Sequence, residues 1–309
     1  MRYLETFRQA WSIAWRRPYL WFLAFLAGEG TYWIGNGSSG RTSTGSPSSE
    51  SWQRFWDFVG ANLGGIAAFG LLLLALGIVC MLISAVATGG VIHGVTEQAA
   101  DRPSSLGPAW SAGARSGARI FWMRVLVAVF VVTTLAIVLG LGLITAALAF
   151  GGATAAAVGL GIFTGMLFIA AAIFWFLLSL ASVLGVRAIA LDGLGAQAGL
   201  RRGFSLIRQR PGRVLLFWLL LTVICTVAGL AALLALGLVA APFAIAAIAI
   251  APHVSSTFAL FLVPLVVLWG FAALVLVGLI EAFASASWTL AYKRFEETSP
   301  AVVTRPLPA

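Results

Sequence analysis

Charged residues are scarce in this sequence of 309 residues, at 9% of the chain against 61% for hydrophobic residues. Soluble domains carry about 25% charged residues, so a chain with so few charges cannot cover a soluble surface. The mean hydropathy of +1.01 supports the same conclusion. The composition excludes a soluble globular protein and predicts one that crosses a membrane several times.

Cysteine and histidine are also rare, with two residues of each. Cys80 and Cys225 lie inside apolar runs with no second sulfur or imidazole at ligand spacing, so we expect two buried apolar side chains. His93, Glu97 and Asp101 are spaced by four and would share a helical face. His93 and Glu97 offer two ligands, fewer than a zinc site normally uses, so we expect a solvated helix end, no metal and no other cofactor.

Catalytic signatures are missing as well. The sequence has no phosphate-binding loop, no dinucleotide fingerprint and no nucleophile elbow, which favours a protein that is not an enzyme. The net charge is +9, and every basic residue except Lys293 is an arginine. These arginines form short clusters between apolar runs, as membrane orientation requires, without the contiguous basic face that nucleic acid needs.

Six apolar segments approach or exceed the length of about 20 residues that a membrane-spanning helix needs. They lie at about 18–34, 63–93, 120–150, 160–186, 214–241 and 258–292. The first is short for a span. Residues 242–252 are apolar but too few to cross, which indicates a re-entrant or interfacial piece.

Basic residues flank one side of these predicted spans, with Arg41 and Arg54 as the exceptions. The positive-inside rule therefore places both termini in the cytoplasm. We treat residues 1–309 as a single integral membrane domain. Within it, the Gly/Ser/Thr-rich stretch 35–51 is expected to be a flexible external loop, and 295–309 a cytoplasmic tail.

An internal repeat precedes the first, third and fifth predicted spans. Residues 7–18 align without gaps with 200–211, and 106–117 joins the same register. The shared positions are Arg8/Arg201, Ser12/Ser111/Ser205, Arg16/Arg115, Arg17/Arg210, Pro18/Pro211 and Trp11/Trp110. The pattern predicts an all-α bundle of about six transmembrane helices, built of three parallel hairpins that each follow a cytoplasmic interfacial amphipathic helix. The alternative is convergent composition, because Arg, Ala and Gly are abundant.

Three stretches carry a family resemblance: 10–22, 186–208 and 284–294. Through them the chain resembles the widespread six-helix bacterial integral membrane proteins that include the membrane domain attached to some glycerophosphodiester phosphodiesterases. The resemblance covers nearly the whole chain, through motifs that are mainly structural. It implies a membrane architecture and a bacterial plasma-membrane location, without an activity.

Two carboxylates fall within predicted spans, where an unpaired charge is costly. Glu281 lies about two-thirds of the way along the sixth segment toward the cytoplasm. It would either pair with an inner-face arginine such as Arg124 or Arg187, or couple to a proton or substrate. Glu29 lies near the outer end of the first segment, where we expect an interfacial role.

The arginines of the interfacial segments provide the predicted contact surface. We expect a non-enzymatic plasma-membrane protein whose partners are membrane lipids or another membrane protein, and not nucleic acid. The alternative is a small-solute or ion transporter that uses Glu281. The residues predicted to contact anionic lipid are Arg8, Arg16, Arg17, Arg115, Arg201, Arg202, Arg208 and Arg210.

Overall fold

A computed structural model of the chain describes residues 3–28, 49–250 and 256–297. Within these ranges the regular structure is α-helical throughout, which confirms the predicted all-α class. The helices are α1 Tyr3–Arg16, α2 Pro18–Ala27, α3 Ser49–Ala61, α4 Leu63–Ala99, α5 Leu106–Phe150, α6 Thr154–Asp192, α7 Ala196–Gln209, α8 Pro211–Ile250 and α9 Ser256–Glu297.

Five of the described helices, α4, α5, α6, α8 and α9, are long and apolar enough to cross a membrane. The shortest described stretch among them has 31 residues. At about 1.5 Å per residue it exceeds a hydrocarbon layer of roughly 30 Å. Much of their apolar surface is exposed, as a helix in contact with lipid requires. By length and composition, the chain is a multi-pass membrane protein.

The first predicted span, at about 18–34, differs in the structure. Helix α2 has ten residues and ends where Gly28 takes a left-handed conformation (φ 61°), with its N–H bonded to the Ala24 carbonyl. Glycine is favoured at such an end because it has no Cβ. Ten helical residues cover about 15 Å, half of the layer. Residues 29–34 lie outside the described part of the chain, which therefore contains five such helices where the sequence predicts six.

Two of the three predicted interfacial segments form separate helices. Single residues, Arg17 and Arg210, separate α1 and α7 from the helices that Pro18 and Pro211 open. Segment 106–117, in contrast, is continuous with α5. Gly117 aligns with the two prolines, and its N–H lets the helix continue where proline would interrupt it.

Helix α8 runs through Pro242 to Ile250. The described part of 242–252 is therefore an extension of a long helix rather than a separate piece. A proline inside a helix removes one backbone hydrogen bond. The helix nevertheless remains continuous on both sides of Pro242.

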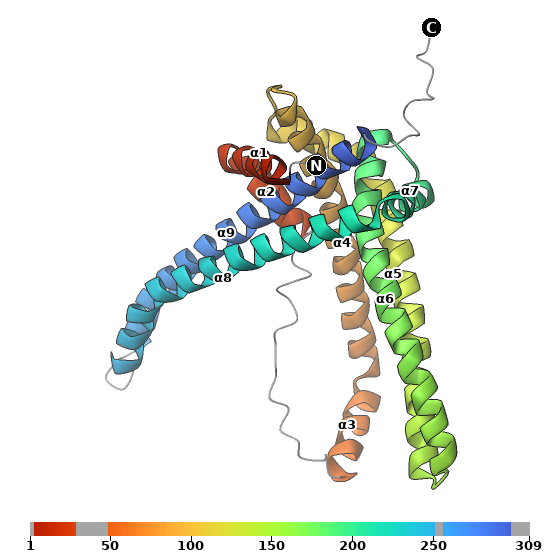
Figure 1. Ribbon diagram of the computed structural model, residues 1–309. Helices are drawn as coiled ribbons and strands as arrows, with labels where there is room; N and C mark the ends of the chain where they lie inside the picture. The colour runs from red at the N-terminus through yellow and green to blue at the C-terminus, as the bar shows by residue number, and fades with distance from the viewer. Residues whose placement is uncertain (1–2, 29–48, 251–255, 298–309) are drawn as a thin grey trace.

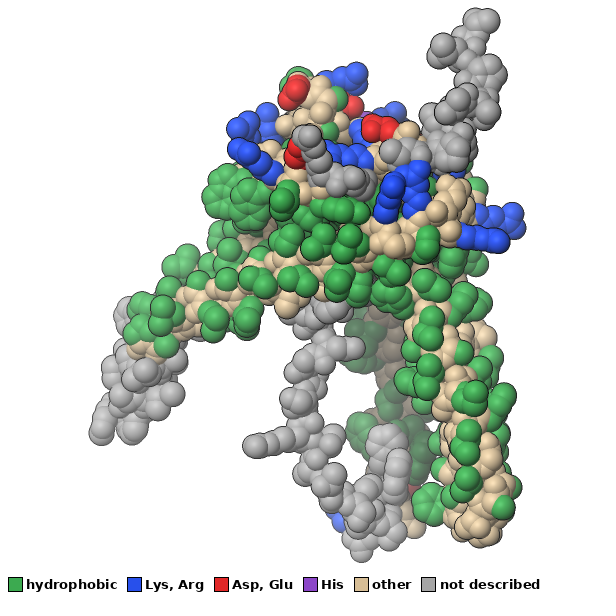
Figure 2. All heavy atoms as spheres, viewed as in Figure 1, with side chains coloured by type: hydrophobic (Ala, Val, Ile, Leu, Met, Phe, Trp, Pro, Cys, Tyr) green, Lys and Arg blue, Asp and Glu red, His purple; other side chains and the backbone are tan. Residues whose placement is uncertain are grey.

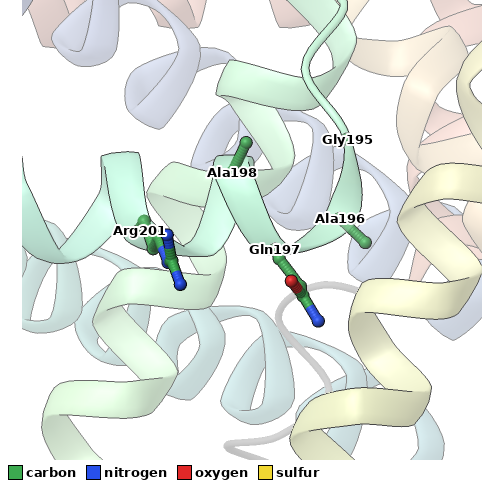
Figure 3. A pocket seen from close by; sticks show the side chains of 5 residues that line it. All are labelled: Gly195, Ala196, Gln197, Ala198 and Arg201. Atoms are coloured by element: carbon green, nitrogen blue, oxygen red, sulfur yellow. The ribbon is translucent and has the colours of Figure 1, made fainter.

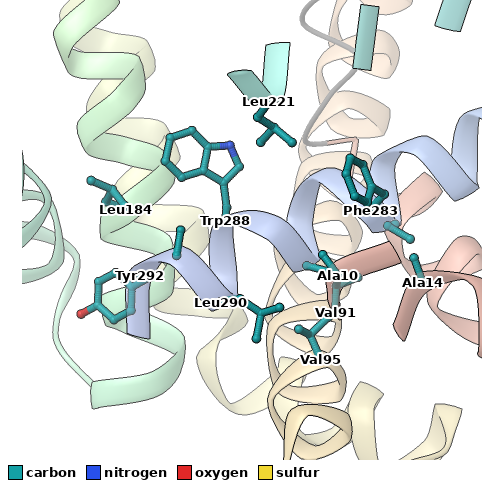
Figure 4. Close-up of a cluster of buried hydrophobic side chains, with 14 of the residues drawn as sticks. Ala10, Ala14, Val91, Val95, Leu184, Leu221, Phe283, Trp288, Leu290 and Tyr292 are labelled. Atoms are coloured by element: carbon teal, nitrogen blue, oxygen red, sulfur yellow. The ribbon is translucent and has the colours of Figure 1, made fainter. Parts of the chain in front are cut away.

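The long helices converge at one end of the molecule and separate toward the other, where the α8–α9 hairpin diverges from the α5–α6 hairpin (Figure 1). At the converging end, α1, α2 and α7 pack against the adjoining ends of the long helices. We call this part the compact end. Its apolar core brings together Ala10 and Ala14 of α1, Val91 of α4, Leu184 of α6 and Phe283 of α9 (Figure 4).

Small residues let three pairs of helices approach closely at the compact end. At each position, a Cβ added to a glycine would meet a backbone carbonyl of the neighbouring helix, so that backbones rather than side chains form the contact. The contacts are Gly113 against the carbonyl of Val86, Gly203 against the carbonyl of Ala181, and Gly278 against the carbonyl of Trp21. These three contacts join α5 to α4, α7 to α6, and α9 to α2.

Candidate functional site

Basic side chains gather at the compact end, while apolar side chains cover the separated parts of the long helices (Figure 2). This distribution places the arginines predicted to contact anionic lipid in one region. Arg8, Arg16, Arg17, Arg115, Arg201 and Arg208 are exposed, whereas Arg202 and Arg210 are half-buried.

Helix α1 exposes its basic residues because the opposite face enters the core. Phe7, Ala10 and Ala14 are buried at helical spacing. Trp11 and Trp15 follow Phe7 at intervals of four residues, but they are 45% and 58% exposed and stack with ring centroids 5.7 Å apart. Tryptophan is favoured at the headgroup level of a membrane. Exposed Arg and Trp together make this end suited to the membrane interface.

Arg202 differs from the other arginines because an acidic partner holds it. Its Nη2 donates a hydrogen bond to Glu296 Oε1 at 3.1 Å. Burial by itself would lower the pKa of the guanidinium, but the hydrogen bond and the negative charge of Glu296 outweigh it, and the pKa is raised. The Tyr292 hydroxyl donates to Asp192 Oδ2 at 2.7 Å and to Glu296 Oε1 at 3.2 Å. These contacts fasten α7 and the end of α6 to α9.

A second polar cluster lies inside the compact end, between α6 and α9. Glu281 is 4% exposed, and Arg187 and Ser285 are 1% and 2% exposed. The Arg187 guanidinium donates to the Val183 carbonyl at 2.7 Å and to the Ser285 hydroxyl at 3.3 Å. Ser285 is one helical turn from Glu281 on the same helix. The structure therefore brings Arg187, one of the two predicted partners, to the part of α9 that carries Glu281.

The other predicted partner, Arg124, is directed toward α4. Its guanidinium donates to the hydroxyls of Ser84 and Thr88, each at 2.7 Å. Ser84 in turn donates to the Ala27 carbonyl at the end of α2, at 2.5 Å. Arg124 therefore links α5, α4 and the short α2 through side-chain hydroxyls.

The remaining residues singled out from the sequence are distributed as follows. His93 Nε2 lies 4.0 Å from Glu97 Oε1, which is also 3.7 Å from Arg102 Nη1. Among the described residues, no group of three or more His, Cys, Asp or Glu side chains is placed to hold a metal ion. Cys80, expected to be buried, is exposed, and Cys225 is half-buried. Glu29 lies outside the described residues.

The predicted loop and tail fall largely outside the described part of the chain. Of the predicted external loop 35–51, the last three residues begin α3. Residues 295–297 of the predicted tail end α9.

An open pocket of about 460 Å³ lies at the beginning of α7 (Figure 3). Gly195, Ala196, Gln197, Ala198 and Arg201 line it, and Gln197 and Arg201 provide its polar side chains (Figure 3). The amino-terminal end of a helix carries a partial positive charge. The pocket is therefore part of the basic surface of the compact end.

No protein-family model, curated protein or solved structure matches the chain. The structure therefore supports one part of the resemblance found in the sequence: the protein is helical and has several long apolar helices.

Proposed function

We propose that the chain is a non-enzymatic plasma-membrane protein that binds the headgroups of anionic lipids at its compact end. The observation that carries the proposal is the segregation of charge, with exposed arginines and stacked tryptophans at one end and apolar flanks elsewhere (Figure 2). A guanidinium can bind a phosphate through two hydrogen bonds. Each basic residue near an anionic membrane surface contributes about 1 kcal/mol.

The orientation that goes with this function places the compact end at the cytoplasmic face. The positive-inside rule supports it, because most basic residues of the sequence lie in the connections at this end. Both termini are then cytoplasmic, and α3 lies on the opposite side. The bacterial plasma membrane, which the sequence resemblance implies, is the proposed location.

The proposed architecture is three repeated units, each an amphipathic segment followed by a hairpin. One pattern of contacts supports it: the start of α5 packs on α4, α7 packs on α6, and α1 packs on α9. The amphipathic segments of the second and third units therefore pack on the last helix of the preceding unit. That of the first unit, α1, packs on α9, the last helix of the third unit. The open flanks of the hairpins would then face lipid or a partner membrane protein.

Lipid retention tests the proposal. Purified protein in mild detergent is incubated with phosphatidylglycerol or phosphatidylcholine, and bound lipid is counted by native mass spectrometry. The double variant Arg201→Gln/Arg208→Gln removes two exposed charges and should weaken phosphatidylglycerol binding about tenfold or more. The matched control, Arg41→Gln/Arg54→Gln, removes the two charges that the positive-inside rule assigns to the opposite side, and it should leave binding unchanged. Equal binding by all three proteins would contradict the proposal.

A transport function is the second candidate, and one observation favours it: a carboxylate, Glu281, is buried in a membrane-spanning helix. Such groups commonly belong to proton or solute pathways. The same burial, with Arg187 and Ser285 close by, also suits a structural role. Solute or proton flux into proteoliposomes separates the two functions. Flux that is lost in Glu281→Gln supports transport, and equal flux in the wild type and the variant removes a coupling role.

A further inference from the structure

A second cavity, of about 470 Å³, lies at the compact end where the junction between α1 and α2 meets the end of α4. This volume is within the range of about 300–1,000 Å³ that is typical of small-molecule sites. The residues that line it are Arg16, Arg17, Gln98, Asp101, Arg102 and Pro103.

Positive charge predominates in this cavity, with three guanidinium groups and one carboxylate. Arg16 and Arg17 are exposed and come from the break before α2. Arg102 comes from the turn after α4, where Glu97 lies 3.7 Å from its Nη1. A guanidinium has five N–H donors, so this contact leaves other donors of Arg102 available. The arrangement suits a ligand with several acceptor oxygens and negative charge, as a phosphate group has.

A buried donor in the wall of the cavity supports a ligand site. The Nε2 atom of Gln98 is shielded from solvent and has no hydrogen-bond partner among the described residues. Leaving such a donor unsatisfied is unfavourable, because its hydrogen bond to water is lost without replacement. A ligand oxygen at this wall would satisfy it after a rotation of the amide.

The two walls of the cavity are fixed to each other. The Tyr19 hydroxyl is 2.7 Å from the Ser104 hydroxyl, which joins the beginning of α2 to the turn after α4. Gly94 of α4 also lies close to α2, because a Cβ at this position would be 3.1 Å from a methyl group of Leu20. The backbone segments that carry the arginines of the two walls are therefore held beside each other.

Asp101 gives the cavity a feature that a simple basic patch lacks. Its backbone φ is 55°, in the left-handed region that Asp adopts more readily than most residues. Its carboxylate can accept hydrogen bonds from hydroxyl or amine groups. It would also repel a second negative charge on the ligand. The cavity thus favours a phosphodiester whose other substituent carries hydroxyl or amine donors.

The position of the cavity relative to the membrane agrees with a ligand at the membrane surface. Trp15, 58% exposed, directly precedes Arg16 in the chain and stacks on Trp11. Tryptophan rings favour the headgroup level of a bilayer. The arginines that follow Trp15 are then placed at the level of lipid phosphates.

We propose that this cavity is a specific binding site for a phosphodiester headgroup with hydroxyl or amine donors, in which Arg16, Arg17 and Arg102 bind the phosphate and Asp101 accepts from the substituent. The proposal rests on the proposed lipid-binding function and assigns it a defined site. The same phosphate chemistry occurs in free phosphate and in a lipid headgroup, and the experiment distinguishes these two sources.

The experiment measures retention of phosphatidylglycerol, phosphatidic acid and inorganic phosphate by the full chain in mild detergent, using native mass spectrometry. Arg16→Gln/Arg17→Gln should reduce retained phosphatidylglycerol about thirtyfold, and Arg102→Gln, which removes one charge, about fivefold. The matched control, Arg8→Gln/Arg115→Gln, removes two exposed charges from the same end without touching the cavity. It should reduce retention less than Arg16→Gln/Arg17→Gln, which removes the same number of exposed charges from the cavity. Because the Arg102 side chain is 70% exposed, its replacement leaves the fold intact.

Each outcome leads to a different conclusion. If the cavity variants and the control lose phosphatidylglycerol equally, the surface charge binds lipid without a defined site, and this proposal fails while the proposed function stands. If neither the cavity variants nor the control loses it, this proposal fails, and the separate Arg201→Gln/Arg208→Gln variant decides the proposed function. If the wild type retains inorganic phosphate as tightly as phosphatidylglycerol, and the cavity variants lose both, the cavity binds free phosphate and the lipid assignment is overturned.

Selectivity tests the role of Asp101. Asp101→Asn keeps a side chain that tolerates the left-handed backbone and removes the negative charge. The variant should bind phosphatidic acid, which carries the larger phosphate charge, more tightly than the wild type. Its preference for phosphatidylglycerol over phosphatidic acid should fall by about fivefold or more. An unchanged preference would remove Asp101 from the site.

Discussion

The guanidinium of Arg187 lies 3.3 Å from the hydroxyl of Ser285, and neither residue is more than 2% exposed. This contact joins α6 to α9 one helical turn from the buried carboxyl group of Glu281. A buried charge is costly unless an opposite charge and hydrogen bonds compensate it. The contributions of Arg187 and Glu281 to stability are therefore expected to be coupled.

Replacing Arg187 by methionine should destabilise the protein by about 3–5 kcal/mol, because it removes a positive charge from the part of the core that holds the buried Glu281 carboxyl group. The double variant Arg187→Met/Glu281→Leu should recover most of this loss. Thermal unfolding in detergent measures both effects. Arg119→Met is the matched control, since Arg119 is an exposed residue that bonds to the Gly193 carbonyl. A double variant as unstable as the sum of the two single variants would show that the residues are independent.

Adding one methyl group at Gly203 should destabilise the contact of α7 with α6 by about 1–3 kcal/mol, because the new Cβ would collide with the Ala181 carbonyl. Gly212→Ala provides the control. A Cβ at Gly212 meets no atom within 4 Å, and alanine favours a helix there. Unfolding temperatures of the two variants report the difference. Equal temperatures would mean that the helices have room to separate.

Removal of the Tyr292 hydroxyl should loosen the end of α6 from α9. In Tyr292→Phe the hydrogen bonds to Asp192 and Glu296 are lost, at a cost of about 1 kcal/mol or more. Hydrogen exchange should show faster exchange of backbone amides near Asp192 and in α7, which Arg202 and Glu296 fasten to α9. Exchange rates that stay at the wild-type level would contradict this role.

Single cysteines introduced at the two ends should report the orientation. In a Cys80→Ala/Cys225→Ala background, Ser105→Cys marks the compact end and Asp57→Cys marks α3 at the far end, and both positions are exposed. A membrane-impermeant maleimide added to intact cells should label the second and spare the first. Labelling of the first alone would reverse the proposed orientation.

The sequence predicts the long helices well because runs of apolar residues determine them directly. The predicted beginning of the second segment at Leu63 and the predicted end of the third at Phe150 agree with the limits of α4 and α5. The first segment was harder to predict, because its apolar core stops at Gly28. The break that the proline pattern predicts is present before α2 and α8, and absent in α5, where glycine replaces proline.

The sequence predicts less of the candidate site. Charge counting identifies the basic connections and one buried carboxylate, but not which elements lie beside each other. Tyr292 and Asp192 meet across 100 residues of sequence, and nothing in their spacing indicates it. Gln98 and Arg16 likewise line the same cavity only because α2 packs on α4. Helical periodicity predicts which face of a helix is buried, but it does not predict which other helix covers that face.

The contact between α1 and α9 has a consequence for biosynthesis. Phe7 stacks on Phe217 of α8 with ring centroids 5.3 Å apart, and lies 6.3 Å from the ring of Phe283 of α9. A ribosome makes α1 long before either partner emerges. The apolar side of α1 must therefore remain at the membrane surface without its partners until the final hairpin has been inserted. A chain released before that point would leave this side uncovered and open to proteolysis.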